Sequence, residues 1–263
     1  MATVRSDELT ALARGVADGL PPEAVEVVLT GSVSRGVADE RSDVEMLVVS
    51  EEELTRDECF AASGLPEPQS WGPQGARGSR VFGYREGVAV EQIWWSRAYA
   101  EEQIAAYAAA DAIAGGVSLR TVGPLESWQE LLRHYPEALA VARIEQAAET
   151  WGGYAPAGVL TLTRDGERVA RTQRMVGDAE RIVRIVFAIN RTWEPTLKRL
   201  ARRLEPLPLK PERLAERLDA AFADDDWLAL TELALETVRL APDGPNVHRA
   251  RTWLAASAEA LRR

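Results

Sequence analysis

The chain has 263 residues, of which 46% are hydrophobic and 27% charged, and its formal net charge is −10. This length allows one large or two ordinary domains with buried cores. No apolar run approaches the roughly 18 residues that a membrane helix needs, and the first residues hold no signal-peptide stretch. Cys59 is the single cysteine, which excludes an intrachain disulfide and, with two histidines, disfavours a zinc site. We expect a soluble, cytoplasmic protein without membrane contact.

The acidity belongs to the N-terminal half of the chain. Residues 1–120 carry 20 Asp and Glu against 10 Lys and Arg, whereas residues 121–263 carry 21 of each. Because nucleic-acid binding depends on a basic surface, this distribution disfavours RNA or DNA as a partner. A cationic or neutral small molecule is easier to accommodate.

The predicted elements begin with a helix over 6–20, which Pro21 and Pro22 end. Strands are expected at 25–30, 44–49, 80–85 and 87–95, and residues 85–87 make a short hairpin connection between the last two. The segment 63–79, rich in Gly, Pro, Ser and Gln, is predicted to be a loop.

From about residue 97 onward the apolar pattern is helical. We expect helices at 97–113, 125–134, 136–150, 166–192, 194–204, 210–222, 226–240 and 246–262. The predicted fold class is α+β: a catalytic domain with a small mixed β-sheet over residues 1–115, then a helical bundle over residues 116–263 that binds substrate or nucleotide. A cleft between two such domains is a usual place for a small-molecule site.

The segment from Gly31 to Met46 carries most of the chemical information. The Gly31-Ser32 turn after the first predicted strand offers backbone N–H groups to an anion. Asp43 and Glu45 stand two residues apart at the start of the next strand, a spacing that points both carboxylates to one face. Hard oxygen ligands beside an anion cradle favour Mg²⁺ and a nucleotide phosphate as ligands.

A third carboxylate, Glu91, is the lone charge in the apolar strand 87–95. Burial of such a charge is costly unless it is paired or bound to a metal. Two-metal phosphoryl transfer generally needs a further carboxylate that positions the attacking hydroxyl, and Glu91 is the candidate. The alternative is an edge strand on which Glu91 faces solvent.

The tryptophans and histidines give weaker evidence about the functional site. Trp94 and Trp95 follow Glu91 and are candidates for stacking on a base or an acceptor ring. Core packing is expected for the other tryptophans considered, namely Trp128, Trp151, Trp193, Trp227 and Trp253. His134 is interpreted as a helix-end residue, and His248 as structural or surface.

The order of these motifs resembles that in the nucleotidyltransferases of the DNA polymerase β superfamily. An apolar strand is followed by Gly31-Ser32 and Arg35-Gly36, and then by Ser42-Asp43-x-Glu45 and a second apolar strand. Within it, the chain is similar to bacterial small-molecule nucleotidyltransferases that inactivate aminoglycosides and lincosamides, and to related antitoxin-type minimal nucleotidyltransferases. The resemblance covers residues 25–50 and, more loosely, residues 80–95.

The resemblance implies a role for each matching residue. Gly31 and Ser32 would contact the triphosphate, Asp43 and Glu45 would bind Mg²⁺, and Glu91 would be a metal ligand or the general base on the acceptor hydroxyl. The chain departs from the family pattern in two places: the second ligand is Glu instead of the commoner Asp, and the strand of Glu91 holds no Asp.

Three more residues are predicted to bind the nucleotide. Arg35 is interpreted either as a phosphate contact or as the ion-pair partner of a nearby carboxylate, Asp39 or Glu40, and Ser42 as a turn residue or a phosphate contact. Residues 164–203 hold 11 basic and 5 acidic side chains and resemble the helical segment that follows the catalytic domain in some relatives. Lys198 is the predicted phosphate contact there.

The expected function is Mg²⁺-dependent transfer of a nucleoside monophosphate to a hydroxyl of a small molecule. ATP, as donor of AMP, is the first nucleoside triphosphate to test, and an antibiotic such as an aminoglycoside is the first acceptor. One alternative is an antitoxin-type enzyme that adenylylates a protein, and another is a non-catalytic nucleotide-binding module. The acceptor, the nucleotide used, the choice of role for Glu91 and the oligomeric state do not follow from the sequence.

Overall fold

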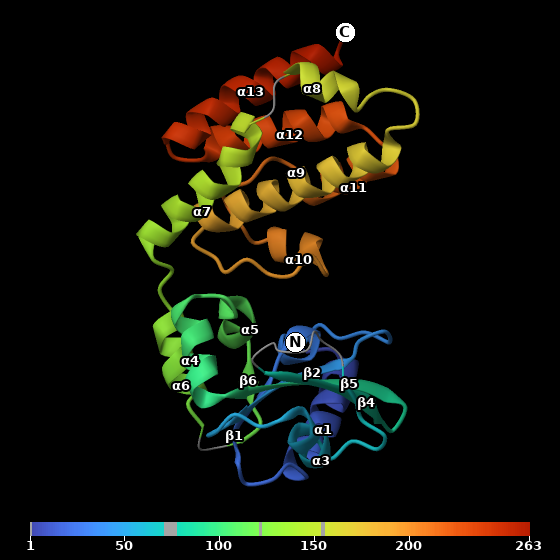
Figure 1. Cartoon of the computed structure of the whole chain (residues 1–263), viewed down its shortest axis with the longest axis vertical. Helices are drawn as coiled ribbons and strands as arrows, with labels where there is room; N and C mark the ends of the chain where they lie inside the picture. The colour runs from blue at the N-terminus through green and yellow to red at the C-terminus, as the bar shows by residue number, and fades with distance from the viewer. Residues whose placement is uncertain (1, 71–77, 121–122, 154–155) are drawn as a thin grey trace. The chain divides into compact units, whose positions relative to one another are not determined.

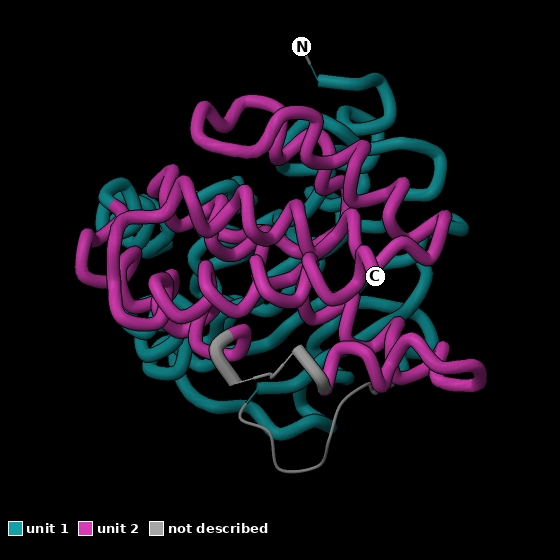
Figure 2. The backbone as a smooth tube through the Cα atoms, turned by 90° about the horizontal axis from the view of Figure 1, so that it is seen from above, with its two compact units in different colours: residues 1–134 teal, residues 135–263 magenta. Residues whose placement is uncertain are grey.

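The computed structural model describes residues 2–70, 78–120, 123–153 and 156–263. The chain divides into two compact units, residues 1–134 and 135–263 (Figure 2). The first is an α/β unit around a mixed sheet and the second is helical, so the predicted α+β fold class is confirmed. The contact boundary lies at 134/135, and the predicted functional boundary at 115/116 stays a prediction.

The sheet of the first unit has six strands in the order β3-β4-β5-β2-β1-β6 (Figure 1). Its strands are β1 (Ala24–Leu29), β2 (Val44–Ser50), β3 (Gln69–Ser70), β4 (Ser79–Arg85), β5 (Val88–Ser96) and β6 (Val117–Ser118). Strands β2 and β5 pair in parallel, and every other pair is antiparallel. The four strands predicted from sequence are confirmed, as is the hairpin between β4 and β5.

Alternation along β5 separates the two faces of this sheet. Val90, Gln92 and Trp94 are buried, whereas Glu91 and Ile93 between them, and Trp95 after them, are half-buried. Val90 and Trp94 join the hydrophobic core that α1 (Val4–Asp18) and α3 (Arg56–Ala62) close from one side. The opposite face therefore carries Glu91.

The remaining helices of the first unit are α2 (Gly31–Ser34), α4 (Arg97–Ala105), α5 (Ala110–Ala114) and α6 (Leu125–Leu132). The single helix predicted over 97–113 is wrong, because the chain turns between α4 and α5, where Tyr107 has a φ of 57°. Helix α3 was missed, although Thr55 and Glu58 form a capping box that the sequence Thr-x-x-Glu signals. The predicted loop 63–79 contains β3, and its residues 71–77 lie outside the described residues.

The second unit contains η1 (Thr150–Gly153) and the helices α7 (Glu137–Glu149), α8 (Pro156–Thr161), α9 (Arg168–Ile189), α10 (Leu200–Leu204), α11 (Leu214–Ala223), α12 (Trp227–Leu240) and α13 (Pro245–Leu261). The helix predicted over 194–204 is confirmed only from residue 200. Pro195 disfavours helical backbone at Glu194, and Arg199 has a φ of 57° directly before α10. No helix in the described part of the chain is long and apolar enough to span a membrane.

A buried carboxylate organises the core of the second unit. Asp178, in the middle of α9, accepts hydrogen bonds from the indole nitrogens of Trp151 at 2.8 Å and Trp227 at 3.3 Å. Arg174 and Arg181, on the same helix, pair with it at 3.2 and 3.1 Å. A buried charge is tolerated when it is paired and hydrogen-bonded in this way, so the core placement predicted for both tryptophans is confirmed.

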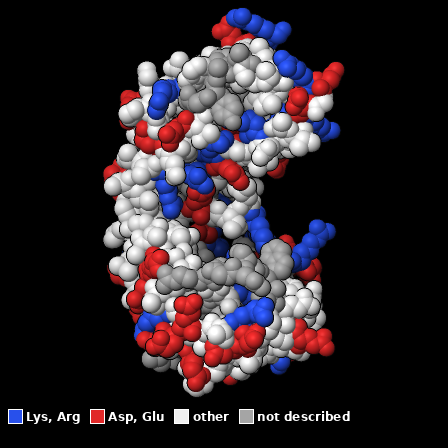
Figure 3. All heavy atoms as spheres, in the orientation of Figure 1, with Lys and Arg blue, Asp and Glu red and all other residues white. Residues whose placement is uncertain are grey.

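Charge is distributed unequally between the units. Residues 1–134 carry 22 Asp and Glu against 11 Lys and Arg, whereas residues 135–263 carry 19 against 20. On the face drawn in Figure 3, acidic side chains gather over the first unit, and both signs are mixed over the second.

Two polar side chains, the buried Glu26 and the half-buried Arg120, attach the chain after α5 to α1 and β1. The carboxylate of Glu26, in β1, accepts hydrogen bonds from Ser118 Oγ at 2.7 Å and from the backbone N–H of Leu125 at 3.0 Å. The second bond caps α6, whose N-cap, Pro124, makes no side-chain cap bond. The guanidinium of Arg120 donates to the carbonyl groups at the end of α1 and beyond it, those of Ala17, Leu20, Pro21 and Ala24.

Replacing Arg120 by alanine should lower the free energy of unfolding of the first unit by about 2 kcal/mol or more, because several carbonyl groups lose a charged donor. Urea denaturation of the full chain followed by circular dichroism measures this. Arg14→Ala, a change of an exposed arginine on α1, is the matched control and should stay within about 0.5 kcal/mol of the wild type. Equal stability of the two variants would contradict the structural role of Arg120.

Candidate active site

The backbone of the Gly31-Ser32 turn, which follows β1, lies in close contact with the carboxylate of Glu45 on the neighbouring strand β2. Gly31 has a φ of 68°, a left-handed conformation that favours glycine. A Cβ atom at Gly31 would overlap Oε2 of Glu45 and lie 3.0 Å from its Cδ. Thr30 holds the two segments together, because its N–H and its hydroxyl both donate to the Glu45 carbonyl, at 2.9 and 3.2 Å. The predicted phosphate turn and the predicted metal ligand are therefore adjacent in space.

The parallel pairing of β2 and β5 brings the third predicted carboxylate beside the second. Glu45 and Glu91 are register partners, so their side chains leave the same face from strands about 4.8 Å apart. Glu91 is 30% exposed and lies 3.7 Å from the Arg80 guanidinium of β4. The alternative in which Glu91 lies on an edge strand is wrong, because β5 is flanked by β4 and β2.

Asp43 directly precedes β2 and is half-buried. Among the described residues its carboxylate forms no hydrogen bond or ion pair, which leaves its oxygens available to a ligand. Two carboxylates together with substrate phosphates are a usual way for proteins to hold Mg²⁺, and Asp43 with Glu45 fits this donor set. The described residues contain no cluster of three or more carboxylate, histidine or cysteine side chains arranged to hold a metal ion. The role of Glu91 as a further metal ligand stays a prediction.

The hydroxyl groups of the two predicted serines lie together. Ser32 Oγ donates to Ser42 Oγ at 3.2 Å, and Ser42 Oγ in turn lies 3.1 Å from Oδ1 of Asp39. Ser42 is thus a turn residue, as one interpretation held, and it is also next to the Gly31-Ser32 turn. Its contact with phosphate stays a prediction.

Arg35 ends the turn and makes an ion pair that the sequence analysis did not include. Its Nη2 lies 2.7 Å from Oδ2 of Asp111 in α5, and both side chains are mostly buried. The sequence analysis considered Asp39 and Glu40 as partners because they are near in the chain. Asp111 was missed because it lies 76 residues further on, and its only signal is that it is the one carboxylate in an alanine-rich segment.

Polar residues at the end of α9 have partners within the second unit. Asn190 ends α9 and exchanges hydrogen bonds with the backbone of Leu209, and Arg191 pairs with Glu137. Lys198 is exposed in the turn before α10. Its contact with phosphate stays a prediction.

The proposed stacking role of Trp94 is wrong. Trp94 is 2% exposed in the core under α1 and donates to Oε1 of Gln92 at 3.0 Å. Trp95 points to the opposite face, where its ring meets that of Tyr99 edge-on with centroids 5.4 Å apart. Cys59 is also unsuited to catalysis, because burial raises the pKa of its thiol.

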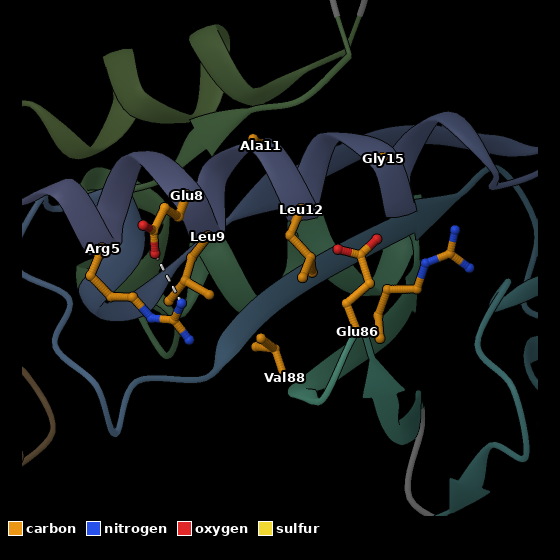
Figure 4. A pocket seen from close by; sticks show the side chains of 9 residues that line it. Arg5, Glu8, Leu9, Ala11, Leu12, Gly15, Glu86 and Val88 are labelled. Carbon is orange, nitrogen blue, oxygen red and sulfur yellow. Dashed lines mark hydrogen bonds and ion pairs between the residues drawn. The ribbon is translucent and has the colours of Figure 1, made fainter.

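A groove of about 420 Å³ lies between α1 and the β4–β5 hairpin (Figure 4). Arg5 and Glu8 stand at one end and Glu86 at the other, with the apolar side chains of Leu9 and Leu12 between them. Because Leu9 packs in the core with Val44 and Val90, this groove belongs to the sheet face opposite Glu45 and Glu91. None of the predicted site residues lines it.

Comparison with known families identifies the type of domain in the first unit. Residues 12–108 match the model of the Nucleotidyltransferase domain. The N-terminal unit contains a nucleotidyltransferase domain of the DNA polymerase β superfamily. The predicted superfamily and the predicted enzyme class, a nucleotidyltransferase, are thereby confirmed. The similarity to aminoglycoside- and lincosamide-inactivating enzymes stays a prediction. Residues 102–200 match a second model, Domain of unknown function (DUF4037).

Comparison with solved structures finds a similar protein. A nucleotidyltransferase-like protein from Exiguobacterium sibiricum 255-15 is similar over 98% of this chain and 74% of its own, with 12% identity and a TM-score of 0.40. A search of curated proteins gave no significant match.

A Gly31→Ala variant tests whether the contact with Glu45 matters for ligand binding. The strained φ should cost about 1 kcal/mol of stability, while the added methyl group must displace the flexible Glu45 carboxylate and so abolish Mg²⁺-dependent nucleotide binding. Calorimetric titration and urea denaturation measure the two effects. Gly15→Ala is the matched control: it adds a methyl group to α1 with no atom within 4 Å and should raise stability by up to about 1 kcal/mol. Unchanged nucleotide affinity in Gly31→Ala would contradict the assignment of this corner.

Proposed function

We propose that this nucleotidyltransferase transfers a nucleoside monophosphate to a hydroxyl group of a small molecule, and that it requires Mg²⁺. AMP from ATP is the first case to test. One observation carries the proposal: the Gly31 backbone, the Glu45 carboxylate and the register partner of Glu45, Glu91, meet at one end of one sheet face. A phosphate turn, a cation ligand and a group that accepts a proton are the parts that nucleotidyl transfer needs.

In this mechanism the residues have separate tasks. Gly31 and Ser32 hold the triphosphate, and Asp43 and Glu45 hold the cation together with the phosphate oxygens. When bound, Mg²⁺ stabilises the negative charge that develops on the transferred phosphoryl group. Glu91 accepts the proton of the acceptor hydroxyl, whose oxygen forms a bond to the α-phosphorus. The bond between the α-phosphorus and its bridging oxygen to the β-phosphate breaks, and pyrophosphate leaves.

The choice of a small molecule as the acceptor rests on charge. The first unit has 22 acidic and 11 basic residues, a balance that disfavours a polyanionic acceptor such as RNA or DNA. A neutral or cationic acceptor is favoured, and a panel of antibiotics that includes aminoglycosides and lincosamides is a suitable first set.

Pyrophosphate release tests the proposal, with ATP, GTP, CTP and UTP each combined with the acceptor panel in Mg²⁺. The wild type should turn over at least one combination, and Asp43→Asn should lower that turnover at least about a hundredfold, since it removes a charged ligand. Glu40→Gln, a change of an exposed carboxylate in the same loop, is the matched control and should keep full turnover.

If the acceptor panel lacks the true acceptor, measurement of triphosphate affinity tests the proposed reaction instead. The wild type should bind one of the four triphosphates more tightly in Mg²⁺ than in chelator, and Asp43→Asn should lose this difference. If no triphosphate binds better in Mg²⁺ and Asp43→Asn changes nothing, the proposed reaction is wrong.

A further inference from the structure

The side chain of Arg35 connects the phosphate turn to α5. Its Nη1 donates to the carbonyl oxygen of Gly31 at 3.2 Å. Its Nη2 donates to Asp111 twice, to the carbonyl oxygen at 2.8 Å and to Oδ2 at 2.7 Å. Charge-assisted bonds of this length are among the stronger polar contacts in proteins. One planar guanidinium therefore holds the Gly31 peptide at a fixed position relative to α5.

Packing leaves this guanidinium little freedom to move. The side chain of Arg35 is 24% exposed and that of Asp111 17%. A Cβ atom at Gly115 would lie 2.8 to 3.0 Å from three atoms of the guanidinium, so the backbone after α5 lies directly against it. Glycine at 115 is what allows this close approach.

Asp111 lies outside the part of the chain that matches the nucleotidyltransferase domain, residues 12–108. It falls within the segment 102–200 that matches the domain of unknown function. In space, however, α5 belongs to the first compact unit, residues 1–134. A residue from the second family segment thus contacts the phosphate turn of the first.

We propose that Arg35 and Asp111 are a positioning pair for the phosphate turn, and that Arg35 acts on the nucleotide through the Gly31 peptide instead of binding phosphate itself. This inference rests on the proposed function, in which Gly31 and Ser32 hold the triphosphate. The pair fixes the Gly31 carbonyl and with it the left-handed turn that lies against Glu45. The segment after residue 108 is then a working part of the catalytic unit.

The bonding of Arg35 favours this role over direct phosphate binding. The guanidinium already directs three hydrogen bonds at Asp111 and the Gly31 carbonyl, and its charge is offset by a carboxylate at 2.7 Å. These bonds suit a positioning role, because a guanidinium that is itself held by several bonds keeps the Gly31 peptide in one orientation.

Three variants of the full chain separate the two roles: Arg35→Gln, Asp111→Asn and the double variant. The probe is the triphosphate, among ATP, GTP, CTP and UTP, that the wild type binds best in Mg²⁺. If the pair positions the turn, each single variant weakens binding about tenfold, the factor for loss of one charge-assisted bond. The double variant is then no weaker than the worse single one, because both changes break the same unit.

The matched control is Glu51→Gln. Glu51 pairs with Arg97 of α4 at 3.0 Å and, like Asp111, joins distant segments of the first unit. This control should leave nucleotide affinity unchanged. Urea denaturation of each apo variant separates positioning from stability, since a merely structural pair would lower the midpoint of unfolding without altering the affinity of the folded protein.

Any other result of these binding measurements would refute the positioning role. If Arg35 bound phosphate directly, Arg35→Gln would weaken binding, whereas Asp111→Asn would leave it unchanged or tighten it, because the guanidinium would be released toward the ligand. Unchanged affinity in both single variants would also refute the positioning pair, with the proposed function intact. A wild type that binds no triphosphate in Mg²⁺ would refute the proposed function and the inference together.

Discussion

The site depends on one steric constraint: the backbone of Gly31 and the carboxylate of Glu45 occupy adjacent space that no side chain at position 31 can share. Gly31 also adopts a left-handed φ of 68°. Glycine meets both demands at once, since it has no Cβ atom and no penalty for positive φ. This contact fixes the proposed phosphate turn relative to Glu45, the proposed second acidic ligand. The parallel register of β2 and β5 then places Glu91 beside Glu45.

Other contacts hold this turn and the loop that follows it. Near the N-terminus, Thr3 donates from its hydroxyl to the carbonyl oxygen of Ala38 at 2.8 Å, and Ser6 Oγ accepts from the N–H of Ala38 at 2.9 Å. From α5, Asp111 holds Arg35. The segment after α5 is in turn tied to the sheet by Glu26 and Arg120. The compact unit that holds the turn, residues 1–134, is thus larger than the segment that matches the nucleotidyltransferase domain, residues 12–108.

Local patterns in the sequence predicted much of this unit correctly. Alternating and continuous apolar runs indicated four of its strands, whereas the shared face expected for Asp43 and Glu45 stays a prediction. What the sequence could not indicate were contacts between distant segments. The ion pair of Arg35 with Asp111 spans 76 residues, and the bonds from Arg120 to the carbonyl groups of Ala17 and Leu20 span 103 and 100. Trp94 was misjudged although a local pattern could have indicated its burial: alternation along β5 places it on the same face as the buried Val90 and Gln92.

The most direct test of the account is to locate a bound cation and nucleotide together. Crystals of the full chain grown with Mn²⁺ and a non-hydrolysable triphosphate would show the cation by its anomalous scattering. The account predicts a peak at about 2 Å from carboxylate oxygens of Asp43 and Glu45, with triphosphate oxygens against the Gly31-Ser32 turn. A triphosphate bound elsewhere, for example in the groove beside Arg5, with no cation at Asp43 and Glu45, would contradict it.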